Sequence, residues 1–397
     1  MILVITPLPP LRTGIAIYSQ KLYSEVGKHI PLIILANKEA IRAYKNKTKL
    51  KIIEAWNYNN PLSFLVLIFK LIKNRKKLLH LQLGYTWIKN PLITQLLVTL
   101  LLIAAKLLRM KTIVTLHGIV TKETLNAYFS AERRGKTEIL IAILYAIYTI
   151  HYKMLTKLSD IVIVHDFNIK RKLLERTGQK YQKKIVIIPH GVDTPILHKK
   201  ITQTKKGKVN LLFTGFIRKN KGIEELIEAI NLLDQQTKEK LKVIIAGSPH
   251  IGDNVNYYKK IKDKIRKYGL EETIELRIEF IPENELSKLL ENADIIALPY
   301  KDYFYEASGV LARVMSYGKP LICTNIPKFS SELKNEIDAI IIPPGDKNIL
   351  AKAIKTLITN REPRQKLAQN LRKKAKLREW QKIAQKHIKL YLSLIKL

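Results

Sequence analysis

The sequence predicts an α/β protein with two doubly wound parallel sheets. Short β-branched runs alternate with longer segments of helical periodicity along most of the chain. The alternation occurs twice, once on each side of a polar, lysine-rich segment. In addition, 397 residues exceed what one hydrophobic core normally organises, so two domains are expected. Strands that alternate with helices form parallel sheets with helices on both faces, which defines the predicted fold class.

The elements of the first predicted domain, residues 1–196, follow from apolar runs and their periodicity. β-branched and leucine-rich runs predict strands at 2–6, 33–35, 79–82, 112–116, 161–164 and 185–188. Longer apolar or amphipathic stretches predict helices that include 18–26, 63–73, 92–108 and 138–158.

The second predicted domain, residues 209–375, repeats this pattern after a linker. The linker, LHKKITQTKKGK at 197–208, has few apolar residues and no periodicity. Strands are predicted at 209–214, 242–246, 274–280, 295–298, 320–324 and 339–342, and helices at 223–233, 254–268, 283–291, 310–317 and 349–359.

Residues 376–397 predict an amphipathic C-terminal helix that packs back toward the N-terminal domain. The apolar set that would make this contact is Trp380, Ile383, Ile388, Leu390, Tyr391 and Ile395.

The chain is strongly basic, with a formal net charge of +37. Residues 1–200 hold 33 basic and 10 acidic residues, and the stretch 51–111 holds ten basic residues against one acid, Glu54. This imbalance indicates a polyanionic partner: a nucleic acid, an acidic lipid surface or a phosphorylated substrate. A general bias of the source toward lysine is the alternative, since both halves are basic.

The cysteine content and the length of the apolar segments narrow the class of protein further. Cys323 is the one cysteine, which excludes an internal disulfide framework and fits a reducing compartment. The first residues predict a strand rather than a basic secretory leader. The longest strongly apolar, uncharged stretch, between Lys89 and Lys106, is 16 residues long, short of the roughly 20 needed to span a bilayer.

Ligands of doubly wound sheets bind at the carboxyl ends of the strands, so each strand-to-helix turn is a candidate site. The first turn, TPLPPLRTGIAIYSQKL at 6–22, brings Thr13 and Gly14 to the start of a helix, where small residues let a phosphate or sugar approach the backbone. The second, LLFTGFIRKNKGIEELIEAI at 211–230, places Arg218 and Lys221 beside a helix N-terminus, which suits a diphosphate. An ordinary solvated basic loop is the alternative for the second turn.

The third turn, in YEASGVLARVMSYGKP at 305–320, places an acid in front of a short helix. The amides of Gly309 and Val310 would be available to a phosphate at the helix start, and Glu306 could accept hydrogen bonds from sugar hydroxyls. An ordinary cap is the alternative, with Ser308 as the capping residue and Glu306 as an acid favoured by the helix dipole.

Three histidines also follow predicted strands. His117, His165 and His190 each come directly after a strand or one residue later, where a ligand crevice is expected. We therefore expect at least one of them to contact a ligand. His80 lies inside a strand and is expected to be structural.

Taken together, these turns resemble the retaining glycosyltransferase family four (group 1 type), whose GT-B fold has two Rossmann-like domains facing each other across a cleft. The resemblance covers nearly the whole chain. Besides the first turn, the matching segments are VTLHG at 114–118, IVIVHD at 161–166, VIIPHGVD at 186–193, FTGFIRKNKGIEELIEAI at 213–230, VIIAGSP at 243–249, NADIIALPY at 292–300, EASGVLARVMSYGKPLICTNI at 306–326 and IIPPGD at 341–346.

The resemblance implies roles for the candidate residues. His117 and Glu306 would be catalytic, with Glu306 at the donor sugar. Thr13, His165 and His190 would line the acceptor side or the cleft. The donor-binding residues would be Gly14, Gly215, Arg218, Lys221, Gly247, Ser308, Gly309 and Val310. No metal ion or other cofactor is expected, because cations and helix amides can carry the charge of the leaving nucleoside diphosphate.

The sequence departs from the family pattern at two positions. The family's second glutamate, which commonly holds the nucleotide ribose, is replaced by Arg313, while Glu306 supplies the first acid. The arginine usually found directly after the strand glycine is replaced by Phe216, and Arg218 takes its place. These features indicate a divergent branch with an EASGVL motif.

The leading hypothesis is a hexosyltransferase that moves a glucose- or mannose-type sugar from a UDP- or GDP-sugar to a hydroxyl of a lipid-linked or membrane-proximal glycan. We expect a cytoplasmic protein, peripheral on the inner face of an anionic membrane, because of the basic 51–111 stretch with its apolar helices. Two alternatives remain: a nucleotide-sugar epimerase of the same fold, and a basic nucleic-acid-binding protein. No nucleic-acid partner is expected, because the ordered strand-end motifs do not fit one and no RNP, zinc or helix-turn-helix signature is present.

Overall fold

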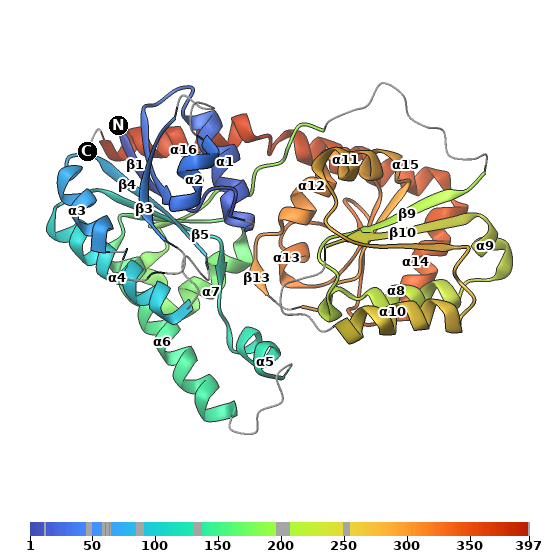
Figure 1. Ribbon diagram of the computed structural model, residues 1–397. Helices are drawn as coiled ribbons and strands as arrows, with labels where there is room; N and C mark the ends of the chain where they lie inside the picture. Colours follow the sequence, from blue (N-terminus) through green and yellow to red (C-terminus); the bar gives the residue numbers. More distant parts are fainter. Residues whose placement is uncertain are drawn as a thin grey trace. The chain divides into compact units, whose positions relative to one another are not determined.

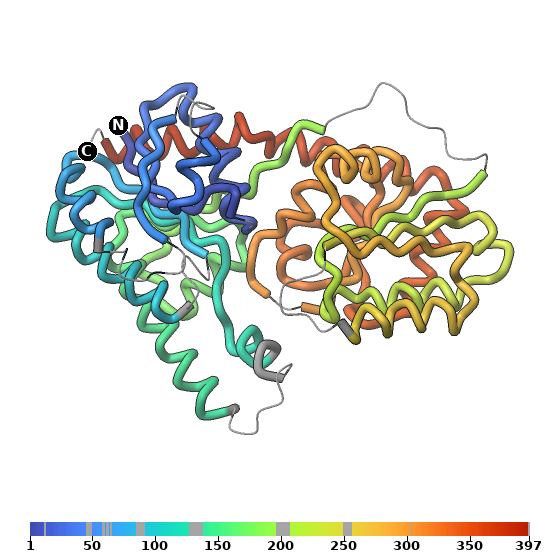
Figure 2. The backbone as a smooth tube through the Cα atoms, viewed as in Figure 1, coloured from blue at the N-terminus to red at the C-terminus, as the bar shows by residue number. Residues whose placement is uncertain are grey.

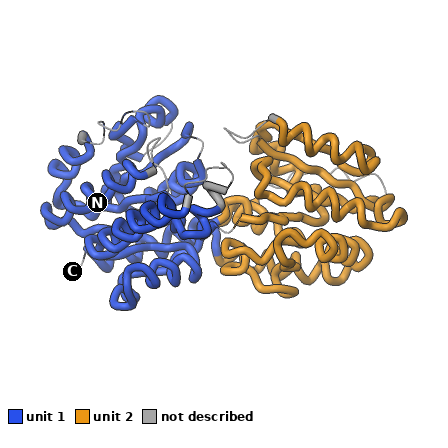
Figure 3. The backbone as a smooth tube through the Cα atoms, turned by 90° about the horizontal axis from the view of Figure 1, so that it is seen from below, with its two compact units in different colours: residues 1–191, 304–307, 378–397 blue, residues 192–303, 308–377 orange. Residues whose placement is uncertain are grey.

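The computed structural model describes residues 1–11, 13–44, 50–57, 60, 63, 65–84, 91–130, 137–195, 207–248, 255–302 and 304–395 (Figures 1 and 2). Its contacts divide the chain into two compact units (Figure 3). Unit 1 comprises residues 1–191, 304–307 and 378–397, and unit 2 comprises residues 192–303 and 308–377. Most of the predicted linker at 197–208 lies outside the described residues.

Unit 1 is built on a seven-stranded parallel sheet with the strand order β3-β2-β1-β4-β5-β7-β8. The strands are β1 (Ile2–Ile5), β2 (Leu32–Asn37), β3 (Lys51–Trp56), β4 (Leu78–Leu83), β5 (Thr112–Leu116), β7 (Ile161–Val164) and β8 (Ile185–Ile187). All residues of β1, β2, β4 and β5 are buried, as expected for continuous apolar runs covered on both faces.

Helices cover both faces of this sheet. One face packs against α1 (Gly14–Val26), α2 (Lys38–Tyr44) and α16 (Trp380–Ile395). The other packs against α3 (Leu65–Lys73), α4 (Pro91–Leu107), α6 (Thr137–Leu158) and α7 (Phe167–Thr177). The short helix α5 (Lys122–Ser130) packs against α6.

Unit 2 is built on a six-stranded parallel sheet with the order β11-β10-β9-β12-β14-β15. The strands are β9 (Val209–Thr214), β10 (Leu241–Gly247), β11 (Ile274–Ile278), β12 (Ile295–Leu298), β14 (Leu321–Thr324) and β15 (Ile340–Ile342). Helix α8 (Ile223–Asn231) packs against α10 (Val255–Lys267) and α14 (Lys347–Thr359), and α12 (Gly309–Tyr317) packs against α11 (Glu283–Asn292) and α15 (Arg361–Lys376). The short helices are α9 (Gln235–Glu239) and α13 (Pro327–Ser330).

The fold-class prediction is confirmed. In both sheets the first strand lies centrally and the order reverses beside it, which is the doubly wound Rossmann arrangement. The carboxyl ends of the strands on either side of this reversal are therefore where ligand-binding turns are expected.

Three strands were not predicted. Strand β3 was missed because Lys51 and Glu54 interrupt its apolar run, which an edge strand tolerates on its partly exposed side chains. Strands β6 (Gly118–Ile119) and β13 (Tyr305–Glu306) have two residues each and pair antiparallel. This pairing places residues 304–307 in unit 1, although the sequence placed them within the second domain.

The C-terminal helix α16 belongs to unit 1 and packs against α1. Its buried residues include Trp380, Ile383 and Tyr391, whereas Ile395, which was expected on the packed face, is 49% exposed. The last turn of the helix presents Leu394 inward instead.

Candidate functional site

In unit 2, two glycines at strand ends pack closely against each other. Gly215 follows β9 with a φ of 133°, a value that favours glycine. A Cβ atom at Gly215 would lie 2.8 Å from the Tyr300 hydroxyl and 3.7 Å from Val310 Cγ2, and a Cβ at Gly247 would overlap the Gly215 carbonyl oxygen. The turns after β9 and β10 and the start of α12 therefore meet around Tyr300.

Lys221 projects into the same region and is held by a buried ionic cluster. Its Nζ atom lies 3.0 Å from Asp302 Oδ2 and 3.9 Å from the centre of the Tyr300 ring. Lys328 Nζ lies 2.6 Å from the other oxygen, Asp302 Oδ1, and the Asp302 and Lys328 side chains are only 3% and 2% exposed. We call this the Lys221–Asp302–Lys328 cluster.

The charge state of the cluster follows from its contacts. Burial raises the pKa of Asp302, whereas the neighbouring Lys328 and Lys221 lower it. The effect of the two lysines is the larger in sum, so the pKa of Asp302 lies below its usual value. Asp302 thus has the amino group of one lysine on each of its carboxylate oxygens, next to the strand-end turns.

Arg218 lies on the same turn as Lys221 and precedes the 3₁₀ helix η3 (Lys219–Lys221). Its carbonyl oxygen accepts hydrogen bonds from the Lys221 amide (3.0 Å) and from the Tyr257 hydroxyl (3.3 Å). The backbone of this turn is therefore fixed on two sides, and the side chain of Arg218 is half-buried.

Helix α12 begins beside these turns. Ser308 caps it, since its Oγ atom accepts a hydrogen bond from the Leu311 amide (3.1 Å). Gly309 is exposed, and no atom lies within 4 Å of the position that a Cβ would occupy. Amides of a first helical turn have no partner within the helix, so the open space at Gly309 is favourable for an anion.

The structure also shows what the unexpected Arg313 does. Its Nη2 atom lies 2.9 Å from Glu283 Oε2 on α11. The arginine in the family's second-glutamate slot thus forms an ion pair with the neighbouring helix.

In unit 1, the three predicted histidines gather around one buried tyrosine. The ring centre of Tyr18 lies 4.6 Å from that of His117, 5.2 Å from that of His165 and 5.1 Å from that of His190. Trp380 of α16 completes the cluster, 5.1 Å from Tyr18.

Hydrogen bonds hold His117 and His165 in place. His117 Nε2 lies 2.8 Å from Gln82 Oε1, and its Nδ1 atom lies 3.1 Å from His165 Nε2. His165 Nδ1 donates to the Ile188 carbonyl (3.0 Å). Burial lowers the pKa of His165 to about 3, and burial together with the neighbouring histidines holds the pKa of His117 well below its usual value. Both rings are therefore neutral near pH 7.

Glu306 lies next to His117 because β13 pairs with β6. Glu306 is the register partner of Gly118, and the Ala307 amide donates to the His117 carbonyl oxygen at 3.1 Å. The two residues predicted to be catalytic are thus brought together within unit 1, and Gly309 follows Glu306 by three positions in the chain.

The first turn has the predicted form. Thr13 caps α1, since its Oγ1 atom accepts a hydrogen bond from the Ala16 amide (3.2 Å). Gly14 is exposed and has open space around its Cα atom.

Several residues of these two clusters were not predicted. Tyr300 and Asp302 lie two and four positions after the end of β12, so their place beyond a strand end could have singled them out. Lys328 gives no signal of its own in a chain with so many lysines. The sequence placed Tyr18 in a helix, Gln82 in a strand and Trp380 on the packed face of the C-terminal helix. Only tertiary contacts reveal their relation to the histidines.

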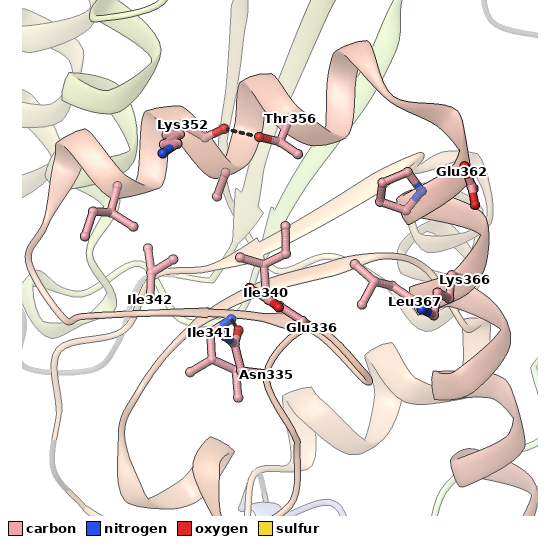
Figure 4. Close-up of a pocket in the computed structure, with 13 residues that line it drawn as sticks. Asn335, Glu336, Ile340, Ile341, Ile342, Lys352, Thr356, Glu362, Lys366 and Leu367 are labelled. Atoms are coloured by element: carbon pink, nitrogen blue, oxygen red, sulfur yellow. Dashed lines mark hydrogen bonds between the residues drawn. The ribbon is translucent and has the colours of Figure 1, made fainter.

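A further hollow lies in unit 2 between β15, α14 and α15, with a volume of about 590 Å³ (Figure 4). Ile340 and Ile342 lie along its floor, and Thr356 and Leu367 line its helical sides. No predicted site residue lines it, so it is separate from the candidate donor site.

Comparison with solved structures identifies the fold. The structure of Anabaena Alr3699/HepE in complex with UDP is similar with a TM-score of 0.75 and 16% identity, over 99% of this chain and 100% of that chain. A sucrose-phosphate synthase from Thermosynechococcus elongatus is similar with a TM-score of 0.73 and 17% identity, over 100% and 99%. The fold is therefore that of the GT-B glycosyltransferases.

Comparison of sequences shows a likeness to one family over the second half of the chain. Residues 196–374 match the family described as Glycosyl transferases group 1. The uncharacterized glycosyltransferase MJ1607 of Methanocaldococcus jannaschii is 26% identical over 46% of this chain and 44% of its own length. A D-inositol 3-phosphate glycosyltransferase of Corynebacterium glutamicum is 27% identical over 45% and 42%. The chain thus spans somewhat less than half the length of these relatives, and its likeness to the group 1 glycosyltransferases covers residues 196–374.

Proposed function

We propose that the protein transfers a hexosyl group from a nucleotide-sugar to an acceptor hydroxyl, with retention of configuration and without a metal ion. The observation that carries the proposal is the convergence in unit 2 of Lys221, the glycine turns and the α12 N-terminus around Tyr300. The family match falls on this unit.

The donor diphosphate would bind at this convergence. Lys221 is already oriented by Asp302 and Tyr300, so little side-chain entropy is lost when an anion binds. Arg218 on the same turn and the first amides of α12, at Gly309 and Val310, would share the remaining charge. These groups stabilise the nucleoside diphosphate as it leaves, which is the charge-developing part of the reaction.

Glu306 and His117 would act on the sugar side. A carboxylate at Glu306 can accept hydrogen bonds from donor-sugar hydroxyls, and its backbone is held by pairing with the strand that follows His117. His117 is the second candidate catalytic residue beside Glu306 in unit 1, with its Nε2 atom 2.8 Å from Gln82 Oε1.

A thermal-shift experiment tests the donor site. We use UDP-glucose first, because Alr3699/HepE was solved in complex with it, followed by GDP-mannose and ADP-glucose. At least one of these should raise the melting temperature of the wild type, because a ligand bound only to the folded state stabilises it. The double variant Arg218→Ala, Lys221→Ala should abolish the shift, whereas Lys219→Ala, an exposed neighbour on the same turn, should retain it. An equal shift in both variants contradicts the site.

Product analysis tests the reaction itself. Slow hydrolysis of the bound donor should release the nucleoside diphosphate and the α-anomer of the sugar, detected by proton NMR. An epimerised nucleotide-sugar without such release identifies an epimerase instead.

A further inference from the structure

Helix α6 carries an apolar stripe on its solvent-facing side. Ile139, Ile143, Ile147 and Ile150 follow one another at spacings of four, four and three residues, and Ile139 is 77% exposed. The next two positions of the same stripe are the exposed residues Lys153 and Lys157. The opposite side of the helix is buried, through Tyr148, Tyr152 and Leu155, in the core beneath the sheet.

The two neighbouring helices repeat this pattern. On α4, Leu96 and Leu107 are 60% and 79% exposed, with Ile93 and Leu100 on the same face. On α3, Phe69 is 68% exposed between Val66 and Ile72. α4 packs against both α3 and α6, and all three helices cover the same face of the sheet, so their stripes form one continuous surface. We call this the α3–α4–α6 face.

Basic residues gather at one edge of this face. All three helices connect parallel strands, so their C-terminal ends lie together at the amino edge of the sheet. The exposed basic residues at these ends are Lys73, Arg75, Lys76, Lys106, Arg109, Lys111, Lys153 and Lys157. The apolar part of α6 lies toward the other edge, where His117 and Glu306 are found.

Among the described residues, α6 is the helix that is long and apolar enough to cross a bilayer, with a mean hydropathy of 1.5 over its most apolar 18-residue window. Its 22 residues extend over about 33 Å, and in Figure 1 it reaches beyond the sheet. Because Tyr148, Tyr152 and Leu155 are part of the unit 1 core, the C-terminal half of the helix lies along the domain. That half can offer only its outer side to a membrane.

We propose that the α3–α4–α6 face docks unit 1 on an anionic lipid surface. Continuous apolar stripes on three adjacent helices exceed the scattered exposure that is normal for a soluble protein. A basic border next to an apolar face complements a bilayer interface, where apolar side chains enter and lysines meet anionic headgroups. A second part of this proposal rests on the proposed function and deepens it. In this part, the acceptor hydroxyl belongs to a molecule held at the membrane.

Vesicle co-sedimentation of the full-length protein tests the docking. We expect it to pellet with phosphatidylcholine–phosphatidylglycerol vesicles at low salt and to be released at high salt, with little binding to pure phosphatidylcholine. Replacing Leu96→Ser together with Ile150→Ser should weaken binding by about tenfold or more. Lys106→Glu with Lys153→Glu should weaken binding to the anionic vesicles by at least as much.

The control removes exposed apolar residues elsewhere. Leu232→Ser with Ile337→Ser, on unit 2, changes residues that are 51% and 50% exposed and should leave binding unchanged. Absence of binding by the wild type, or equal loss in the control, overturns the proposal. If the Leu96–Ile150 pair instead abolishes self-association in sedimentation velocity, a second copy of the chain covers the face.

The proposal of membrane docking and the proposal of the donor site can be refuted independently. All docking variants should keep the wild-type melting shift with UDP-glucose or the donor that gives the largest shift. Lost docking with an intact donor shift leaves the proposed function standing, and normal docking without any donor shift refutes the function alone.

Discussion

Asp302 shows how one buried residue can prepare a cationic site. Its carboxylate bonds to Lys221 on one oxygen and to Lys328 on the other. Burying charges is costly, and the cost is offset only when partners are close and complete. Since two lysines share this one carboxylate, Lys221 is held in place and oriented toward Tyr300.

Asp302→Asn should therefore destabilise unit 2. Removing the carboxylate leaves two ammonium groups close together, one of them almost fully buried, at a cost of about 3 to 5 kcal/mol. The midpoint of urea unfolding, followed by circular dichroism, measures this. Asp263→Asn, at an exposed position on α10, serves as the control and should change little. A stability equal to that of the wild type would show that the cluster is not a structural unit.

The buried histidines of unit 1 make its stability dependent on pH. Burial lowers the pKa of His165 to about 3 and that of His387 to about 4, below the value of about 6.5 expected in the unfolded chain. The stability they permit is thus complete above about pH 6.5 and is lost as the pH falls toward 4, because only the unfolded state takes up protons in this range.

At pH 5, each of these histidines should lower the free energy of unfolding by about 2 kcal/mol relative to pH 7.5. His387→Gln should remove the contribution of this histidine. The loss of unfolding free energy between pH 7.5 and pH 5 should then be smaller by about 2 kcal/mol. His29→Gln, at an exposed position, should leave the wild-type pH dependence intact. Urea titrations at both pH values provide the comparison, and an unchanged slope in His387→Gln counts against the assignment.

At the scale of elements, regular periodicity could be predicted and short tertiary pairings could not. Helix α12 follows from Ser308, the apolar spacing and Gly318, because cap and period are local properties. Strand β13 exists only because residues far away in the sequence pair with it. The candidate donor turns were accessible from the sequence for the same local reason, whereas the Tyr18 cluster and the role of Asp302 depend on neighbours that no local pattern encodes.

Helix α16 stabilises unit 1 through Trp380. The indole packs against Tyr18 and His190, and a side chain at Gly191 would overlap it. Trp380→Ala should lower the stability of unit 1 by about 3 to 5 kcal/mol through the cavity it leaves. Leu392→Ala, on the exposed side of the same helix, should cost far less. Unfolding followed by far-ultraviolet circular dichroism compares the two, and equal costs would mean that α16 does not anchor through its indole.

At the scale of the whole molecule, the sequence predicted two sheets because strand and helix periods alternate twice. The chain, however, does not divide once. Unit 1 takes residues from before, within and after the span of unit 2, through 1–191, 304–307 and 378–397. This assignment arises from α16 packing on α1 and from the β6–β13 pair, both of which join distant parts of the chain.

That discontinuity has a consequence for biosynthesis. As a ribosome extends the chain, all strands of the seven-stranded sheet have been made long before α16. Until α16 follows, the surface of α1 that it covers stays exposed. Unit 2, by contrast, has all of its residues once residue 377 has emerged. The domain that begins first is thus the one that finishes last, and its unshielded apolar face during that interval is where nascent chains would need a chaperone.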